Sequence, residues 1–181
     1  MAIIKVYRTE VDLESHRTQA VTTLKFYRPQ RQGYRDIPMK IDTGSSITLL
    51  RNLTFQGLGV EAKAIGGESE ATATNGSKFV VQQMQLTGAL EIGKVRIENP
   101  IVYVTKPKTE QESKIDNARS NLLGFDLISC CANFSINMPT NFKLMTCQFL
   151  FRSDRLKRYC TKIDAPEKLT DEIEFEDMPL D

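Results

Sequence analysis

Hydrophobic and polar residues alternate along most of the chain, which is the period of a half-buried β-strand. In residues 37–41, for example, every second position is Ile or Met. The same period predicts further strands at residues 3–7, 21–27, 79–86, 90–97 and 101–104. A helical pattern is clear only at residues 122–132 and weaker at residues 51–58. We therefore expect an all-β protein with one short helix.

Turn-forming residues separate the predicted strands. Residues 29–33 predict a hairpin turn, and residues 139–141 predict another one between strands at residues 134–137 and 142–149. Many short strands joined by such turns are typical of antiparallel architectures rather than of parallel α/β sheets. The pattern favours a small closed β-barrel.

A short polar run follows the strand at residues 37–41. It consists of Asp42, Thr43, Gly44 and Ser45, and apolar residues resume after it. Glycine lets the chain turn sharply here. A carboxylate held between two apolar segments is partly desolvated, so it must be hydrogen-bonded, neutralised or used in chemistry. The run predicts a functional aspartate on a tight turn.

Two other segments accompany this turn. Residues 121–128 read Asn-Leu-Leu-Gly-Phe-Asp-Leu-Ile, and residues 64–76 carry two adjacent glycines and end in Asn-Gly. Each segment alone would be an ordinary helix start or hairpin, and Asp-Thr-Gly alone would be an ordinary turn. In this order, however, the three resemble the retropepsin-like (retroviral-type) branch of the aspartic proteases, over roughly residues 20–150.

The resemblance implies a role for each residue of the polar turn. Asp42 would be the catalytic aspartate, Thr43 would bond across to the same loop of a partner, and Gly44 would let the two loops approach closely. Ser45 would hydrogen-bond a carboxylate beside the substrate. The catalytic set predicted in this way is Asp42, Thr43 and Gly44.

The resemblance also implies that residues 64–76 form the flap, a hairpin that closes over the substrate. Ile65, Gly66 and Gly67 would contact the substrate from the flap tip, and Ser45 would do so from the turn. This flap has no aromatic residue close to its predicted tip. We therefore expect it to hold the substrate through backbone hydrogen bonds and through Ile65.

The length of the chain bears on how such a site is assembled. With 181 residues there is room for one lobe but not for two, and the chain has a single Asp-Thr-Gly. Two carboxylates are needed, so the resemblance implies a homodimer in which each copy supplies Asp42. Retroviral members usually carry Arg in the position of Phe125, where it supports the dimer through ion pairs. Here the dimer must rest on other contacts.

The sequence predicts one folded domain and a tail. We expect the protease domain at residues 1–152, with a polar surface insertion at about residues 105–121. Residues 153–181 are basic and then acidic: from Asp164 onward there are eight acidic residues and one lysine. Such charge density predicts that the tail is disordered.

Composition argues against several other classes of protein. Lys and Arg number 24 against 23 Asp and Glu, and the positive excess of residues 1–163 is scattered, so we expect no nucleic-acid partner. No apolar stretch is long enough for a membrane span and the N-terminus lacks a leader pattern, so we expect a cytoplasmic protein without membrane contact. The four cysteines lack metal-ligand spacing, we expect the adjacent Cys130 and Cys131 to pack as small apolar residues, and we expect no metal or cofactor. A single histidine gives little support to a Ser or Cys triad.

The sequence thus predicts a homodimeric aspartic endopeptidase that hydrolyses peptide bonds with a water activated by the Asp42 pair. The peptide would bind in an extended form between the two subunits. The alternative is a retropepsin-fold module that binds peptides or dimerises without catalysis. The intact run from Asp42 to Gly44 argues against this alternative.

Overall fold

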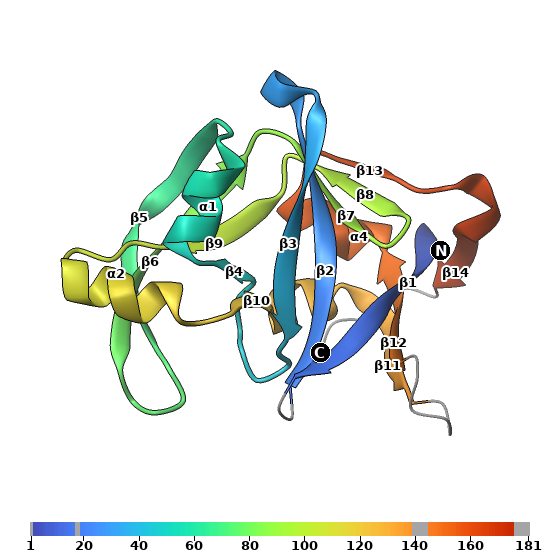
Figure 1. Cartoon of the computed structure of the whole chain (residues 1–181). Helices are drawn as coiled ribbons and strands as arrows, with labels where there is room; N and C mark the ends of the chain where they lie inside the picture. The colour runs from blue at the N-terminus through green and yellow to red at the C-terminus, as the bar shows by residue number, and fades with distance from the viewer. Residues whose placement is uncertain (1, 17–18, 139–144, 176–181) are drawn as a thin grey trace.

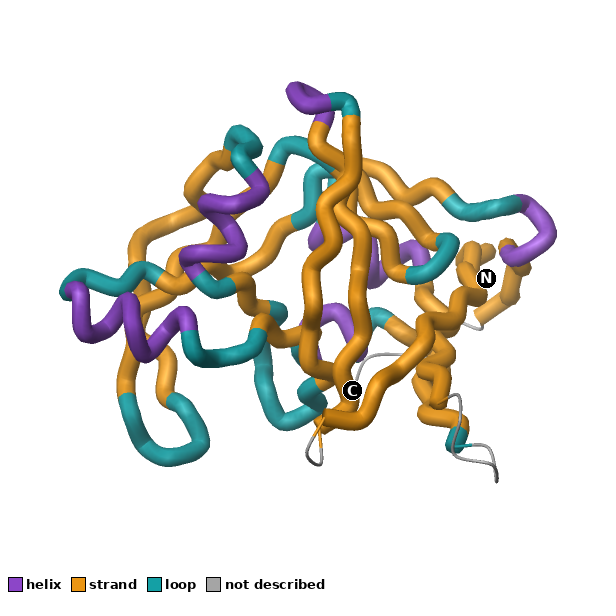
Figure 2. Tube along the Cα trace, in the orientation of Figure 1, coloured by secondary structure: helices purple, strands orange, loops and turns teal. Residues whose placement is uncertain are grey.

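The computed structural model describes residues 2–16, 19–138 and 145–175, and it is mostly β (Figures 1 and 2). Its strands are β1 (Ala2–His16), β2 (Gln19–Arg28), β3 (Gly33–Ile41), β4 (Leu49–Leu50), β5 (Ala62–Thr72), β6 (Lys78–Leu86), β7 (Ala89–Ile92), β8 (Val95–Glu98), β9 (Ile101–Thr105), β10 (Asn121–Leu123), β11 (Cys131–Asn137), β12 (Met145–Arg152), β13 (Lys162–Asp164) and β14 (Thr170–Phe175). Its α-helices are α1 (Asn52–Leu58), α2 (Glu110–Asn117), α3 (Phe125–Ile128) and α4 (Ser153–Leu156).

The antiparallel pair of β2 and β3 forms the centre of the fold. The turn predicted at residues 29–33 joins them, beginning with a 3-10 turn at Pro29–Arg31. The alternating residues Leu24 and Phe26 of β2, with Ile37 and Met39 of β3, are each 1 % exposed. The period-2 pattern therefore marks the core face of this hairpin, as predicted.

The sheet is open, so the prediction of a closed barrel was wrong. The strand order is β11-β12-β1-β2-β3-β10-β4-β9-β6-β5, and its two ends, β11 and β5, do not pair with each other. Most residues of β5 are exposed to solvent. Its hairpin with β6 extends away from the core in Figure 1, and this prevents closure of the sheet.

The helices differ from the prediction of one short helix. The segment predicted at 51–58 does contain α1, but the one predicted at 122–132 is mostly taken up by β10, β11 and the four-residue α3. The polar insertion at 105–121 contains α2, whose residue Asp116 is buried. Among the described residues, no helix combines the length and hydropathy needed to cross a membrane.

The C-terminal segment is folded as far as Phe175, so the prediction of a disordered tail was wrong for this part. Leu156 of α4 is fully buried and Cys160 is 8 % exposed. β13 pairs with β8, and β14 pairs with β1. The prediction failed because charge density says nothing about edge pairing, in which charged side chains stay in solvent. Residues 176–181, the end of the predicted tail, lie outside the described residues.

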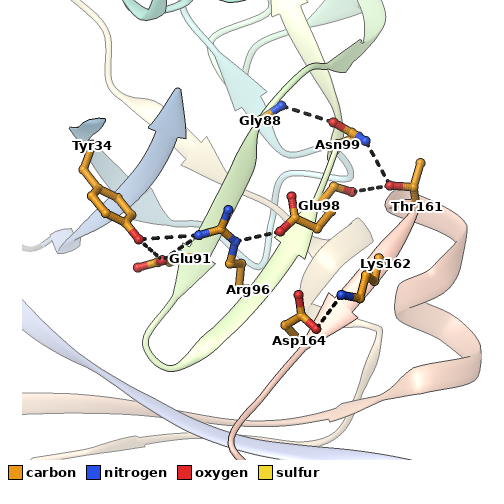
Figure 3. A network of polar contacts seen from close by, with 9 residues as sticks. All are labelled: Tyr34, Gly88, Glu91, Arg96, Glu98, Asn99, Thr161, Lys162 and Asp164. Carbon is orange, nitrogen blue, oxygen red and sulfur yellow. Dashed lines mark hydrogen bonds and ion pairs between the residues drawn. The ribbon is translucent and has the colours of Figure 1, made fainter. Parts of the chain in front are cut away.

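Polar contacts hold the C-terminal segment to β8 (Figure 3). The backbone N–H of Thr161 donates to the Glu98 carbonyl at 2.9 Å, and Asn99 donates to the Thr161 hydroxyl at 3.1 Å. Within β8, Arg96 donates from Nε to Glu98 at 2.7 Å. The Arg96 guanidinium also lies 4.8 Å from the ring centre of Tyr27. These contacts belong to the scaffold, since none of these residues lines the cleft described below.

All four cysteines are buried and form no disulfide, which confirms the prediction that Cys130 and Cys131 pack as small apolar residues. Burial raises the pKa of Cys130, Cys131 and Cys147 to about 12, and that of Cys160 to about 11. Thiols of this kind stay protonated at neutral pH and are poor nucleophiles.

Candidate active site

Asp42 lies directly after β3, in a loop of residues 42–48 that leads to β4. Strand β10 runs between β3 and β4, parallel to β3, with Leu122 opposite both Lys40 and Leu49. The backbone N–H of Asp42 donates to the Leu123 carbonyl at 3.0 Å. The two halves of the Asp42 loop are thus fixed to a strand that lies about 80 residues later in the sequence.

The Asp42 carboxylate is partly desolvated, as the sequence predicted. Its side chain is 25 % exposed. Oδ1 accepts a hydrogen bond from the N–H of Gly44 at 3.1 Å, and Oδ2 lies 3.3 Å from the Lys40 ammonium. The local turn supplies the first contact, and the period of β3 supplies the second because residues 40 and 42 point to the same side.

The other residues of the turn fit the predicted roles unevenly. Ser45 Oγ donates to the carbonyl of Ile47 at 2.9 Å, and within the described residues it bonds to no carboxylate. Its hydroxyl therefore stiffens its own loop, contrary to the expected role. Thr43 and Gly44 are exposed on the single chain. A contact of Thr43 with a second copy stays a prediction.

Sequence reasoning missed Asp126, which ties the Leu-Leu-Gly segment to the Asp42 loop. Its two carboxylate oxygens accept from the hydroxyl of Thr48 at 2.6 Å and from the N–H of Thr48 at 2.9 Å. The Thr48 hydroxyl in turn accepts from the N–H of Gly124 at 3.1 Å. The N–H of Phe125 donates to the carbonyl of Ser45 at 2.7 Å. The signal was a polar residue inside an apolar segment, but its partner lies 78 positions away.

The segment predicted to be the flap lies in the β5/β6 hairpin, but the tip of this hairpin is not where we predicted it. The hairpin turns at residues 73–77, where the N–H of Ala73 donates to the carbonyl of Ser77 at 2.8 Å and Gly76 has a φ of 80°. Gly66 and Gly67 instead form a bulge within β5, at the register shift between Ile65 and Glu68. A bulge also favours glycine, and Gly66 has a φ of 69°.

A cleft of about 920 Å³ lies between the Asp42 loop and the flap tip. In Figure 1 both segments lie on the lower side of the molecule, with α2 beside the flap. The cleft is lined by residues 44–47, 71–75 and 118–120, together with Gln19, Lys40, Asp42, Leu49, Arg51, Phe79 and Leu122.

The cleft changes the predicted set of substrate contacts. Ser45 lines it, but Ile65, Gly66 and Gly67 do not. Phe79 of β6 lines it instead and supplies an aromatic side chain two residues past the tip segment. Arg119 lines it from the loop of residues 118–120 between α2 and β10. Phe79 was not predicted because the glycine pair was assigned to the tip, and Arg119 was not predicted because it lies in the segment expected to be a surface insertion.

Cations outnumber carboxylates along the cleft. Lys40, Arg51 and Arg119 line it, and Asp42 is the one carboxylate among the described lining residues. Arg51 is buried and forms an ion pair with Asp116 at 3.3 Å. Burial lowers the pKa of the Arg51 guanidinium, and Asp116 opposes this shift. Arg51 is thus neutralised behind the cleft wall.

The chain is similar in sequence to a known protein family and in structure to a solved protease. The sequence model of the family described as Aspartyl protease matches residues 31–127, which hold the Asp42 loop, the flap and β10. A solved structure of a retropepsin-like aspartic protease from Rickettsia conorii is similar at 16% identity and a TM-score of 0.46, over 82% of this chain and 95% of that one. No curated protein matches the chain. Because the family match spans more than half of the chain, the protein belongs to the aspartyl protease family, and the resemblance inferred from its sequence is confirmed.

Proposed function

We propose that the protein is a retropepsin-like aspartic endopeptidase that works as a homodimer, with one Asp42 from each copy activating a shared water. The observation that carries the proposal is the position of Asp42. It lies, 25 % exposed, on the wall of a cleft that the flap hairpin covers from the other side.

The chemistry requires a base that takes a proton from water and an acid that protonates the departing nitrogen. Two adjacent carboxylates that share one proton perform both tasks, because two like charges in close contact resist simultaneous ionisation. A single chain offers only Asp42 among its described cleft residues. The second carboxylate therefore comes from a second copy.

Two exposed features beside Asp42 suit contact with that second copy. Thr43 and Gly44 are exposed on the single chain, although they neighbour a half-buried carboxylate. Phe125 is 52 % exposed, and its backbone bonds directly to the Asp42 loop. Burial of such a large aromatic side chain against a partner removes apolar surface from water and so stabilises the contact. We assign to Phe125 the apolar part of the dimer contact.

One contact favours the rival function, a peptide-binding module without catalysis. Lys40 and Asp42 form an ion pair in the single chain, at 3.3 Å. The ammonium stabilises the charge of Asp42 without a second carboxylate, which is what a module without catalysis requires. In the proposed enzyme, the partner's Asp42 competes with Lys40 for this position when the dimer forms.

The substitution Asp42→Asn separates the two functions. We expect it to abolish cleavage of a mixed peptide library, with the products read by mass spectrometry, because an amide can neither accept nor share the catalytic proton. Asp36→Asn is the matched control, since Asp36 is exposed on β3, the strand that leads to Asp42, and it should cut like the wild type. Equal cleavage by wild type and Asp42→Asn would remove Asp42 from the mechanism. A wild type that binds peptides but never cuts them would support the rival.

A further inference from the structure

Arg119 reaches from the loop of residues 118–120 to the flap. Its backbone N–H donates to the Asp116 carbonyl at 3.0 Å, which fixes it at the end of α2. Its Nη2 donates to the hydroxyl of Ser77, at the flap tip, at 3.1 Å. That hydroxyl donates onward to the Asn75 side chain at 2.7 Å. Arg119 therefore joins the loop of residues 118–120 to the flap tip and also lines the cleft.

The charge of Arg119 is unmatched within the described part of the chain. Lys40 has Asp42 and Arg51 has Asp116, but among the described residues the only side-chain hydrogen bond of Arg119 goes to a neutral hydroxyl. Its side chain is half-buried, so part of its hydration is lost. A guanidinium has five N–H donors in a planar fork, and one bond to Ser77 leaves most of them free.

We propose that Arg119 determines specificity: it binds the carboxylate side chain of an Asp or Glu in the peptide that occupies the cleft. This inference rests on the proposed function only in that the cleft takes a peptide. A carboxylate matches the guanidinium fork in two parallel hydrogen bonds, a geometry that neither a lysine nor a neutral amide in the peptide can form. Lys40, the other cation on this side of the cleft, pairs with Asp42 in the wild type and loses that partner in Asp42→Asn, so the comparison with Arg119→Gln, in which Lys40 is unchanged, assigns the carboxylate to one of the two.

The position of Arg119 also couples recognition to the flap. The acidic side chain would meet a guanidinium that already holds Ser77, so bound peptide and flap tip share one anchor. A basic side chain at the same subsite would meet like charge and lose the anchor.

Peptide binding to full-length Asp42→Asn protein tests this without any need for hydrolysis. The probes are capped peptides that differ only in having Glu, Gln or Lys at one position, with that position scanned along the peptide and binding measured by fluorescence anisotropy. We expect Glu to bind about tenfold more tightly than Gln at one position, as a charge-assisted hydrogen bond allows. Adding Arg119→Gln should remove this preference, and Arg119→Glu should transfer it to Lys.

The control is Lys114→Gln, which removes one positive charge from the exposed side of α2, where Lys114 pairs with Glu110. It should keep the preference for Glu. A Glu preference that survives Arg119→Gln, or no Glu preference at any position, would overturn the inference. Uncapped versions of the same peptides are measured alongside, and tight binding of these alone would also overturn the inference, since it would assign Arg119 to the free C-terminal carboxylate of the peptide. Wild type that binds Glu peptides without cutting them would refute the proposed function alone, and wild type that cuts without preferring Glu would refute this inference alone.

Discussion

Gly124 has no room for a side chain. A Cβ built on it would lie 2.1 Å from the carbonyl oxygen of Ile47 and 2.8 Å from the backbone nitrogen of Thr48, closer than real Cβ contacts occur. The glycine of the Leu-Leu-Gly segment is therefore needed because the backbone of the Asp42 loop touches it.

Substitution of this glycine should damage the fold and the site together. We expect Gly124→Ala to lower the free energy of unfolding by about 3 kcal/mol, since backbone must move on both sides of the contact. Gly67→Ala is the control, because its Cβ would meet nothing within 4 Å, and it should change stability by less than about 0.5 kcal/mol. Urea denaturation measures both. Equal stability of the two variants would show that the close packing of residues 47 and 124 is unimportant.

At the scale of single residues, the sequence predicts hydrogen bonds between residues that are close together in the chain. The bond from Gly44 to Asp42 spans two residues, and a polar turn between apolar strands predicts it. The bonds of Asp126 to Thr48 span 78 residues, and those of Asp116 to Arg51 span 65. Such pairs depend on how strands align in space, so no local pattern contains them.

At the scale of elements, α2 is part of the scaffold rather than a solvated insertion. The carboxylate of Asp116 accepts from the hydroxyl of Thr105 at 2.6 Å, from the N–H of Asn52 at 3.0 Å and from Arg51 at 3.3 Å. The N–H of Asn52 lies at the start of α1, where it has no partner within the helix, and it is shared between Asp116 and the Thr105 hydroxyl. One buried side chain thus joins α2, β9 and α1 behind the cleft.

Removal of the negative charge of Asp116 should lower the stability of the protein. We expect Asp116→Asn to destabilise the protein by about 3 kcal/mol, because it leaves the buried Arg51 guanidinium without its counterion. The exposed pair of Glu110 and Lys114 on the same helix provides the control, and Glu110→Gln should cost less than about 0.5 kcal/mol. Thermal unfolding followed by circular dichroism compares them. If Asp116→Asn loses no more stability than Glu110→Gln, residues 105–121 are a surface insertion, as the sequence predicted.

The positions of the strands were largely predictable, but the turns and bulges that interrupt them were not. Alternation of apolar residues placed β2, β3, β6 and β9 within a few residues. It did not divide residues 90–97 into β7 and β8, although Gly93 marks the turn with a φ of 60°. Glycine serves turns and bulges alike, which is why the pair at 66–67 was assigned to the flap tip.

At the scale of the whole molecule, pairing between distant edges decides the shape. The order of strands leaves β11 and β5 as free ends, and β14 pairs with β1 across the length of the chain. Neither composition nor periodicity specifies which edges meet. For this reason the open sheet and the folded segment at residues 153–175 could not be predicted from the sequence.

The proposed dimer places the exposed Phe125 in the subunit contact. We expect Phe125→Glu to raise the dimer dissociation constant at least about tenfold, since it removes an aromatic contact and places two like charges near each other. Leu53→Glu is the control, because Leu53 is 57 % exposed on α1, away from the Asp42 loop. Analytical ultracentrifugation over a dilution series reports both constants. An unchanged constant for Phe125→Glu would exclude Phe125 from the interface.

The central claim is that two copies of Asp42 form one site, and mixing of subunits tests it most directly. Wild type is held at a fixed concentration while Asp42→Asn protein is added, with total protein above the dimer dissociation constant and time allowed for exchange. Random pairing predicts that the activity per wild-type subunit falls to about half at equal amounts and to about a tenth at ninefold excess, because each mixed dimer has one competent carboxylate. Activity per wild-type subunit that stays constant throughout the titration would contradict the shared site.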